Sequence, residues 1–589
     1  YIAVTGVQTC ALPISFSGTA GQAAPRMLVM IGERDAALRG VGAHVVSAAG
    51  TDISGVNETL TAANAQVSPL FGDTEDRLIA RRYSAPTSEE AGEEPELELF
   101  YAVTAPEDRL DALAAELAQK PGVAGAYVSP APEPAVELQE AASAPFIVDE
   151  EAVNAQQPSP NEAPPASPDF TSRQGYLDPA PGGVDARYAW TLRGGRGWNV
   201  RIIDCEGAWR FTHEDLRSNQ GGVIRNQTTD LGWRNHGTAV VGEFGGDVNT
   251  IGVTGICPQA HARGCSIFDT GGLPGAIMAA ADRSRPGDII LIEVQYGHPS
   301  RGYTSVEWWP ADFAAIRYAV NRGIIVVEAA GNGNNDLDHA DYDTPLNGFP
   351  QDWSNPFRRG SRDSGAVLVG AGAPPPGTHG RNHGPDRSRL GFSNYGSAVD
   401  VQGWGREVTT AGYGDLQGGS NEDLWYTDRF SGTSSASPIV VGALGCVQGV
   451  LRAAGRIPLS PARARSLLRS TGSPQTDAPG RPRAQRIGNR PNLRQLIPAA
   501  LRTREWIGVQ FTGAVPANST RRWFTHSWPA HWHVVWTVVP TSPRSGGPQI
   551  RWDVEVERAS DSRITYWISI TNRTSDEVRI EARYAVLGW

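Results

Sequence analysis

The chain has 589 residues, a net charge of −11, and 40% apolar and 20% charged residues, which is the balance of a soluble globular protein. The acidic excess argues against a protein whose main role is to grip nucleic-acid phosphates, and the absence of any run of 18 apolar residues argues against a membrane span. At about 150 residues per domain, this length predicts several units.

The first residues are expected to be an artefact. Residues 4–14 read VTGVQTCALPI, which resembles the translation of a common sequencing adapter, so residues 1–15 are excluded from reasoning about the fold. We expect a metagenomic fragment truncated at its start, in which no signal peptide would be visible. Without Cys10, four cysteines remain, too few for a disulfide framework, and we expect buried free thiols at Cys205, Cys257, Cys265 and Cys446.

Residues 26–129 predict an α+β unit. Leu97–Val103 has the composition of a strand, and Gly122–Val128 that of a second one. Between them, Pro106–Gln119 carries apolar residues at helical spacing.

A proline-rich segment follows at residues 130–174. It holds nine prolines between Pro130 and Pro168, with many Ala, Glu and Ser residues. Such a composition cannot bury a core, so we expect an extended, exposed linker that is easily cleaved.

Residues 175–501 predict a large α/β domain. Short apolar runs alternate with helical patterns, which is typical of a buried parallel sheet flanked by helices. The strand-like runs are Val200–Ile203, Ile289–Val294, Ile324–Glu328 and Val367–Val369, and the helical patterns include Ala311–Asn321 and Pro438–Ala453.

Residues 503–589 predict a small all-β domain. This part holds 8 of the 17 tryptophans, and apolar residues recur with a period of two from Trp532 to Val538 and from Ile564 to Ile570. A period of two is typical of half-buried strands, and a β-sandwich is the architecture that we expect.

Candidate catalytic residues lie in the α/β domain. Asp204 ends a buried strand, His236 precedes small residues, Ser434 opens an apolar helix and Asn332 follows a strand. A serine nucleophile needs a base such as His, a buried carboxylate to fix the imidazole tautomer, and donors for the developing oxyanion. These four residues therefore predict nucleophilic acyl transfer.

These motifs resemble those of the subtilases, the subtilisin-like serine peptidases, over about residues 175–500. The chain order Asp, His, Ser is that of the family, and the motifs are HGTAVVG at 236–242, AAGN at 329–332 and GTSSASP at 432–438. The resemblance implies a seven-stranded parallel sheet and hydrolysis of peptide bonds. One departure is Cys205-Glu206 after the Asp, and we expect Glu206 to face away from the site because Glu is most often exposed.

Two further sites are implied by the resemblance alone. The substrate would lie along EVQYGHP at 293–299, bordered by Gln295, Tyr296 and Gly297, with Gly271-Gly272 at the opposite edge. A structural Ca²⁺, not required for catalysis, would be held in an oxygen-rich loop, with a tight loop that needs no ion as the equal alternative. Its ligands would be Asp215, Asp247, Asn249, Ile251 and Val253.

The leading hypothesis is a secreted bacterial serine endopeptidase made as a zymogen. It would act on proteins or peptides, bind its own propeptide at residues 26–129, and be cut between Pro130 and Gly175. The alternative is a catalytically silent binding or adhesion protein that uses the Trp-rich C-terminal domain. The intact Asp204, His236, Asn332 and Ser434 argue against silence.

Overall fold

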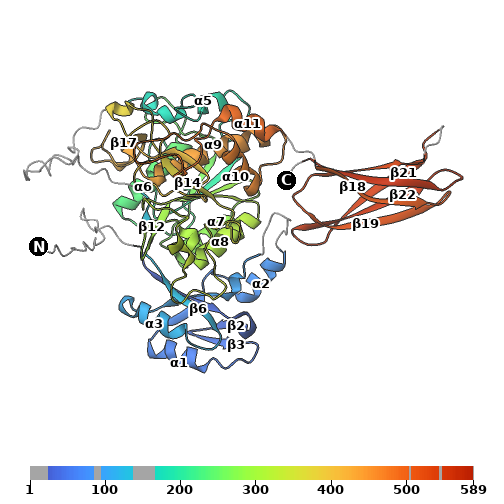
Figure 1. Cartoon of the computed structure of the whole chain (residues 1–589), viewed down its shortest axis with the longest axis horizontal. Helices are drawn as coiled ribbons and strands as arrows, with labels where there is room; N and C mark the ends of the chain where they lie inside the picture. Colours follow the sequence, from blue (N-terminus) through green and yellow to red (C-terminus); the bar gives the residue numbers. More distant parts are fainter. Residues whose placement is uncertain are drawn as a thin grey trace, which may run out of the picture.

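A computed structural model of the chain describes residues 24–84, 94–136, 166–219, 221–502, 506–542 and 547–587. The adapter-like start and most of the proline-rich linker lie outside these residues. In chain order the described parts form an N-terminal α+β domain, a central α/β domain and a C-terminal all-β domain that projects to one side (Figure 1).

The N-terminal domain is built on a four-stranded antiparallel sheet in the order β4-β5-β1-β6. The predicted strand, helix and strand are present as β5, α3 and β6. The elements are β1 Met27–Gly32, β2 Leu38–Val41, β3 His44–Ser47, α1 Ser54–Ala62, β4 Gln66–Pro69, α2 Glu75–Ser84, β5 Phe100–Thr104, α3 Leu110–Leu117 and β6 Val123–Ser129. The only lysine of the chain, Lys120, lies between α3 and β6 and pairs with Glu116 at 3.3 Å.

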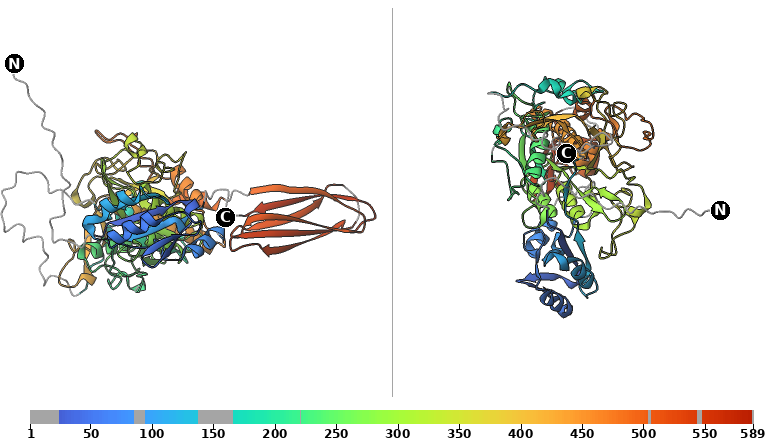
Figure 2. Two further views of the ribbon diagram at one scale, coloured as in Figure 1. Left: turned by 90° about the horizontal axis from the view of Figure 1, so that it is seen from below. Right: turned by 90° about the vertical axis from the view of Figure 1, so that its left-hand side faces the viewer.

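Both faces of this sheet are buried, against different partners. Leu28 and Met30 of β1 face the domain's own helices α1 and α3. Val29 and Ile31, which alternate with them, belong to an apolar core shared with two helices of the central domain, α7 Gly272–Ala281 and α8 Pro310–Asn321. These helices therefore lie between the N-terminal sheet and the central sheet (Figures 1 and 2).

The central domain contains a sheet of six parallel strands in the order β15-β14-β13-β10-β8-β9. The strands are β8 Arg201–Cys205, β9 His261–Gly264, β10 Ile289–Ile292, β13 Ile325–Ala329, β14 Val367–Gly372 and β15 Val401–Trp404. The family resemblance implied seven strands. At the two edges of the described sheet only isolated parallel bridges form, Val401 with Asn489 and Val223 with Gly264, so neither edge gains a seventh strand.

Helices cover both faces of this sheet. Ile202 of β8 faces the layer that contains α6 Leu231–Gly245 and α9 Thr433–Ala453, whereas Ile203 faces α7 and α8. Among the described helices α9 alone is long and apolar enough to cross a bilayer, but that stretch is wholly buried inside the domain. The remaining helices are α5 Ala186–Ala189, α10 Pro461–Ser470 and α11 Leu493–Leu501.

Shorter strands border the central sheet. They are β7 Glu133–Pro134, β11 Val294–His298, β12 Gly302–Thr304, β16 Val408–Ala411 and β17 Tyr426–Phe430. The four described cysteines are buried free thiols, as predicted.

The C-terminal domain is a sandwich of two three-stranded antiparallel sheets, β18-β23-β20 and β19-β22-β21. Its strands are β18 Trp506–Val515, β19 Thr520–Pro529, β20 Val534–Pro540, β21 Ile550–Arg558, β22 Arg563–Asn572 and β23 Val578–Val586. Trp528 and Trp536 are buried and contact Tyr566 and Tyr584, so part of the tryptophan content is explained by the core. The predicted fold class is confirmed.

Candidate active site

His236 lies on the second turn of α6. The helix begins after Asp230, whose carboxylate accepts a hydrogen bond from the backbone N–H of Trp233 and so caps the first turn. The imidazole is 1% exposed and contacts the rings of Trp233 and Phe430 edge-on. It faces the carboxyl end of β8, where the predicted acidic residues lie.

Ser434 occupies the first turn of α9. Gly432 precedes the helix at φ 108°, a conformation that disfavours other residues and lets the chain turn sharply into the helix. At this position the backbone N–H of Ser434 has no partner within the helix. It is therefore available to a group in the cleft.

Asn332 follows β13, and both its side-chain amide and its backbone N–H are held by neighbouring residues. Its Oδ1 accepts hydrogen bonds from the backbone N–H and the hydroxyl of Thr433, at 3.0 and 2.9 Å. Its own backbone N–H donates to Oε1 of Gln295 at 2.9 Å. Because Oδ1 is held by Thr433, the Nδ2 donor points in a fixed direction.

A segment of the chain's own sequence lies in the cleft between these residues. β7 pairs antiparallel with β11, with Pro134 opposite Val294 and Glu133 opposite Gln295. The next residue, Ala135, is fully buried. The segment is thus bound as an added strand, the way an extended peptide is bound at a sheet edge.

The carbonyl oxygen of Ala135 accepts two hydrogen bonds. One comes from the backbone N–H of Ser434 at 3.1 Å and the other from Nδ2 of Asn332 at 2.7 Å. These distances are those of donors that stabilise an oxyanion. The hydroxyl of Ser434 and Nε2 of His236 are both buried, and neither has a hydrogen-bond partner among the described residues.

The carboxylate that contacts His236 belongs to Glu206, not to Asp204. Nδ1 of His236 donates to Oε2 of Glu206 at 2.7 Å, whereas Oδ2 of Asp204 accepts from Nε1 of Trp209 at 2.7 Å. The expectation that Glu206 faces away from the site is therefore wrong. Residues two apart on a strand share a face, so Glu206 follows Asp204 toward α6.

Burial dominates the ionisation of these groups. It lowers the pKa of His236 to about 4, which leaves the imidazole neutral at neutral pH, with the proton on Nδ1 and the acceptor lone pair on Nε2. Burial raises the pKa of Asp204 and of Glu206 well above the usual range of a carboxyl group.

The predicted substrate residues are only partly brought together. Nε2 of Gln295 donates to the carbonyl of Pro134 at 3.3 Å. Tyr296 points away from the segment, into a buried contact with Trp309. Gly297 pairs with Tyr303 of β12 rather than with the segment.

Gly271 and Gly272 do not border the bound segment. A β-carbon on Gly271 would lie 2.5 Å from the carbonyl oxygen of Leu70, and one on Gly272 would lie 3.7 Å from the side chain of Met27. Both partners belong to the N-terminal domain, and the missing β-carbon of Gly271 lets the backbone of that domain approach α7 closely. The sequence reasoning also missed Tyr303, whose hydroxyl donates to Glu133 at 2.6 Å.

The side chains expected to bind calcium are instead bonded to proton donors. Oδ1 of Asp215 accepts from Nδ2 of Asn249 at 2.6 Å, and Oδ2 accepts from the N–H of Val253 at 2.7 Å and the hydroxyl of Tyr426 at 2.8 Å. Asp247, Ile251 and Val253 were expected to offer backbone carbonyls rather than side chains, and the carboxylate of Asp247 accepts from Ser218. A calcium ion needs oxygen lone pairs where these donors lie, so the side chains of Asp215 and Asn249, as they are placed, do not fit the ion.

We therefore expect a chelator to leave thermal stability unchanged. An ion bound only to the native state at 100 times its Kd would contribute about 2.7 kcal/mol, which its removal would abolish. Thermal unfolding followed by calorimetry with and without excess EDTA is the measurement. A lower Tm in EDTA that calcium restores and magnesium does not would re-establish the ion-bound loop.

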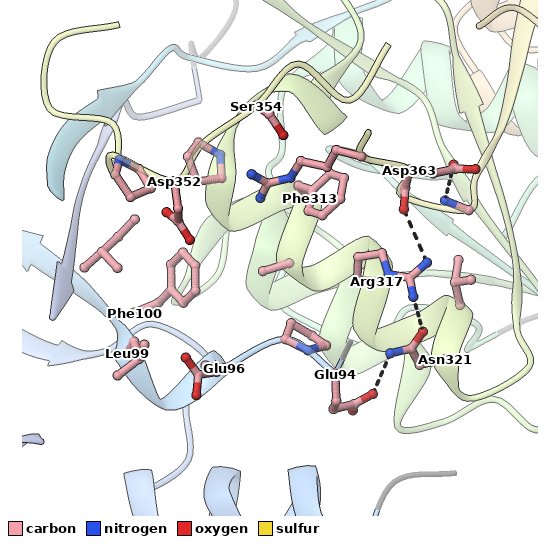
Figure 3. A pocket seen from close by; sticks show the side chains of 18 of the residues that line it. Glu94, Glu96, Leu99, Phe100, Phe313, Arg317, Asn321, Asp352, Ser354 and Asp363 are labelled. Atoms are coloured by element: carbon pink, nitrogen blue, oxygen red, sulfur yellow. Dashed lines mark hydrogen bonds between the residues drawn. The ribbon is translucent and has the colours of Figure 1, made fainter. Parts of the chain in front are cut away.

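A cavity of 1320 Å³ lies away from Ser434, between the N-terminal domain and α8. Figure 3 shows Glu94 bonded to Asn321, which accepts from Arg317. Glu94 also pairs with Arg322 at 2.7 Å. These contacts join the two domains across the cavity, and we assign it to their interface rather than to substrate.

Comparisons with known proteins show the family of the chain. A family model described as the subtilase family matches residues 195–489, half of the chain. Thermitase of Thermoactinomyces vulgaris is 26% identical over 307 residues, which are 50% of this chain and 88% of thermitase. Subtilisin NAT of Bacillus subtilis subsp. natto is 24% identical over 278 residues, 46% of this chain and 62% of that protein.

Solved structures include the patellamide maturation protease PatA, with 23% identity, a TM-score of 0.37, and coverage of 52% of this chain and 97% of that one. From the family match and the residues described above, the chain belongs to the subtilase family, the subtilisin-like serine peptidases.

Proposed function

We propose that the chain is a serine endopeptidase made as a zymogen, and that its first substrate is its own Ala135–Val136 bond. The observation that carries the proposal is the carbonyl of Ala135, which is held by two donors beside Ser434. This bond falls within the stretch from Pro130 to Gly175 in which the sequence predicts cleavage.

The residues present support each step of acyl transfer. The Ser434 oxygen attacks the carbonyl carbon of Ala135, and Nε2 of His236 accepts its proton. The negative charge that develops on the Ala135 oxygen is stabilised by the N–H of Ser434 and Nδ2 of Asn332. His236 then protonates the amine of Val136 as it leaves, and water hydrolyses the acyl-enzyme.

The N-terminal domain is suited to the role of propeptide. It presents β7 to the cleft and is anchored on the peptidase helices by polar contacts as well as by the shared apolar core. Arg81 pairs with Asp282 at 2.7 Å, and the backbone N–H of Ala311 donates to the hydroxyl of Tyr127 at 3.0 Å. We propose that this domain inhibits the enzyme until it is released after secretion.

The bound segment also indicates the class of substrate. Because the side chain of Ala135 is fully enclosed, the site favours a small residue before the scissile bond. Tyr303 offers a hydroxyl to the acidic residue two positions earlier, Glu133. Protein or peptide segments that can extend along β11 with these side chains are the proposed substrates.

The test is the N-terminus of the mature enzyme. Wild-type protein made in a protease-free translation system is expected to yield a fragment that begins at Val136, identified by N-terminal sequencing and intact mass. Ala135→Arg should block this cut, because its side chain does not fit the enclosed position. Ala131→Arg, in the same segment but four residues earlier and partly exposed, should be cut normally.

Cleavage at another bond, or equal cleavage of both arginine variants, would refute the assignment of this bond. A wild-type chain that neither cuts itself nor reacts with a fluorophosphonate probe would instead favour the silent binding protein.

A further inference from the structure

Two acidic residues, Asp204 and Glu206, share the buried space beside His236. We propose that Glu206 is the positioning carboxylate of His236, and that Asp204 acts through it as a neutral hydrogen-bond donor. This inference rests on the proposed function, because it concerns the same reaction.

The strand geometry places both carboxyl groups on the catalytic side of the sheet. Ile202 faces the layer of α6 and α9, and Asp204 and Glu206 continue the same alternation, whereas Cys205 faces α7 and α8. Glu206 comes directly after β8 and its side chain is one methylene longer than that of Asp204. The longer side chain reaches Nδ1 of His236.

The hydrogen bonds made by the four carboxyl oxygens of Asp204 and Glu206 indicate that the pair shares one proton. Trp209 donates to Oδ2 of Asp204, and His236 donates to Oε2 of Glu206. The remaining atoms, Oδ1 of Asp204 and Oε1 of Glu206, are buried, and no donor in the described part of the chain bonds to them. The two carboxyl groups interact, since Glu206 is one of the causes of the raised pKa of Asp204. Two adjoining buried carboxylates cannot both be charged, so one of them carries a proton.

The surroundings decide which one holds the proton. Burial and then the charge of Glu206 raise the pKa of Asp204, while the hydrogen bond from Asp204 counteracts the rise in the pKa of Glu206. The carboxylate of Glu293 is also buried nearby and adds no positive charge. Glu206 accepts from His236, which becomes positively charged in the reaction, whereas Asp204 accepts from the neutral indole of Trp209. We therefore assign the proton to Asp204 and the negative charge to Glu206.

In this arrangement, two residues share the role that one carboxylate usually has in orienting the catalytic histidine. Glu206 fixes the imidazole tautomer and stabilises the imidazolium that forms when Ser434 is deprotonated. Asp204, held by Trp209, keeps the second oxygen of Glu206 in place. A neutral donor at position 204 is then sufficient, whereas a negative charge at position 206 is required.

Paired amide substitutions separate the two roles. Glu206→Gln removes the charge next to His236 and is expected to slow self-cleavage on the order of 10⁴-fold, the effect of forcing the wrong imidazole tautomer. Asp204→Asn keeps an N–H donor directed at Glu206 and should slow it less than about tenfold, the scale of one exchanged neutral hydrogen bond. The rate of appearance of the Val136 N-terminus in the full chain is the measurement, and Tm checks that both variants fold.

A second readout does not depend on activity. In the Ser434→Ala chain, which stays intact, the Nδ1 proton of His236 should give a low-field NMR resonance with cross-peaks to the side chain of Glu206. Adding Asp204→Asn should retain the resonance, and adding Glu206→Gln should remove it. This measurement decides the assignment even if one amide variant does not fold in the active background.

Several outcomes would overturn the inference: Asp204→Asn as slow as Glu206→Gln, Glu206→Gln nearly as fast as wild type, or cross-peaks to Asp204 alone. Failure of the proposed function is distinguishable, because in that case Ser434→Ala itself would still cut.

Discussion

Ser434→Ala is expected to abolish self-cleavage and peptide hydrolysis, with a loss on the order of 10⁶ in turnover, the scale seen when the nucleophile of such an enzyme is removed. Within the described ranges the Ser434 hydroxyl has no hydrogen-bond partner, so its removal breaks no hydrogen bond there. The fold should therefore survive with an unchanged Tm. Turnover of a peptide with Ala before the scissile bond, and labelling by a fluorophosphonate, are the measurements.

The adjacent serine supplies the control. The Ser435 hydroxyl donates to the carbonyl of Trp404 at 3.0 Å and is fully buried. Ser435→Ala should keep most of the activity but lose about 1 kcal/mol of stability with that hydrogen bond. Residual turnover of more than a few per cent in Ser434→Ala, or an equal loss in both variants, would show that Ser434 is not the nucleophile.

Asn332→Leu is expected to lower kcat by about 10²- to 10³-fold with little change in KM, because it removes one of two oxyanion donors. The Nδ2 group lies 2.7 Å from the Ala135 oxygen, and the N–H of Ser434 would remain as the second donor. Asn332→Asp, which keeps the shape but replaces the donor with a negatively charged acceptor, should lose at least as much. Steady-state kinetics of the processed enzyme measure both parameters.

Asn335 provides a matched comparison in the same loop. Its Nδ2 donates to the carbonyl of Tyr303 at 3.2 Å and not to the bound segment. Asn335→Ala should therefore reduce stability while kcat stays within a few-fold of wild type. Unchanged kcat in Asn332→Leu would contradict the oxyanion role.

Much of the central fold could be predicted because its signals are local. Ile289–Ile292 is a short apolar run of the length and β-branched composition that favour a buried strand, and it forms β10 at the middle of the sheet. The long apolar stretch after GTSSASP predicts the helix α9. Both segments are buried on all sides, so most of their residues are apolar. That composition is visible in the sequence without knowledge of the neighbouring elements.

The role of Glu206 could not be read in the same way. Glu is most often exposed, and that general tendency favoured Asp204 at the strand end. The alternation along β8 does place both residues on one face, so the sequence narrows the choice to two carboxyl groups. Which of them reaches His236 depends on side-chain length and on Trp209, which holds Asp204, and no local pattern encodes those contacts.

The binding of Glu133–Ala135 in the cleft could not be predicted from the sequence, for a different reason. Glu133–Ala135 belongs to a proline-rich stretch that cannot form a core of its own, and such a stretch resembles a linker. It is ordered by pairing with β11, about 160 residues later in the chain. A contact of that range leaves no periodicity in either segment, so only the folded chain brings them together.

The position of Lys120 gives the chain an unusual chemical asymmetry. Its side chain is 27% exposed in the N-terminal domain, and no lysine follows it in the remaining sequence. After cleavage at Ala135–Val136, the enzyme portion would carry no ε-amine, and its new α-amine would be its one primary amine. A succinimidyl dye attached to Lys120 would therefore stay entirely with the released domain. The fluorescence anisotropy of the dye would fall when the smaller labelled domain leaves the enzyme. The catalytic portion would carry no dye and would not contribute to the signal.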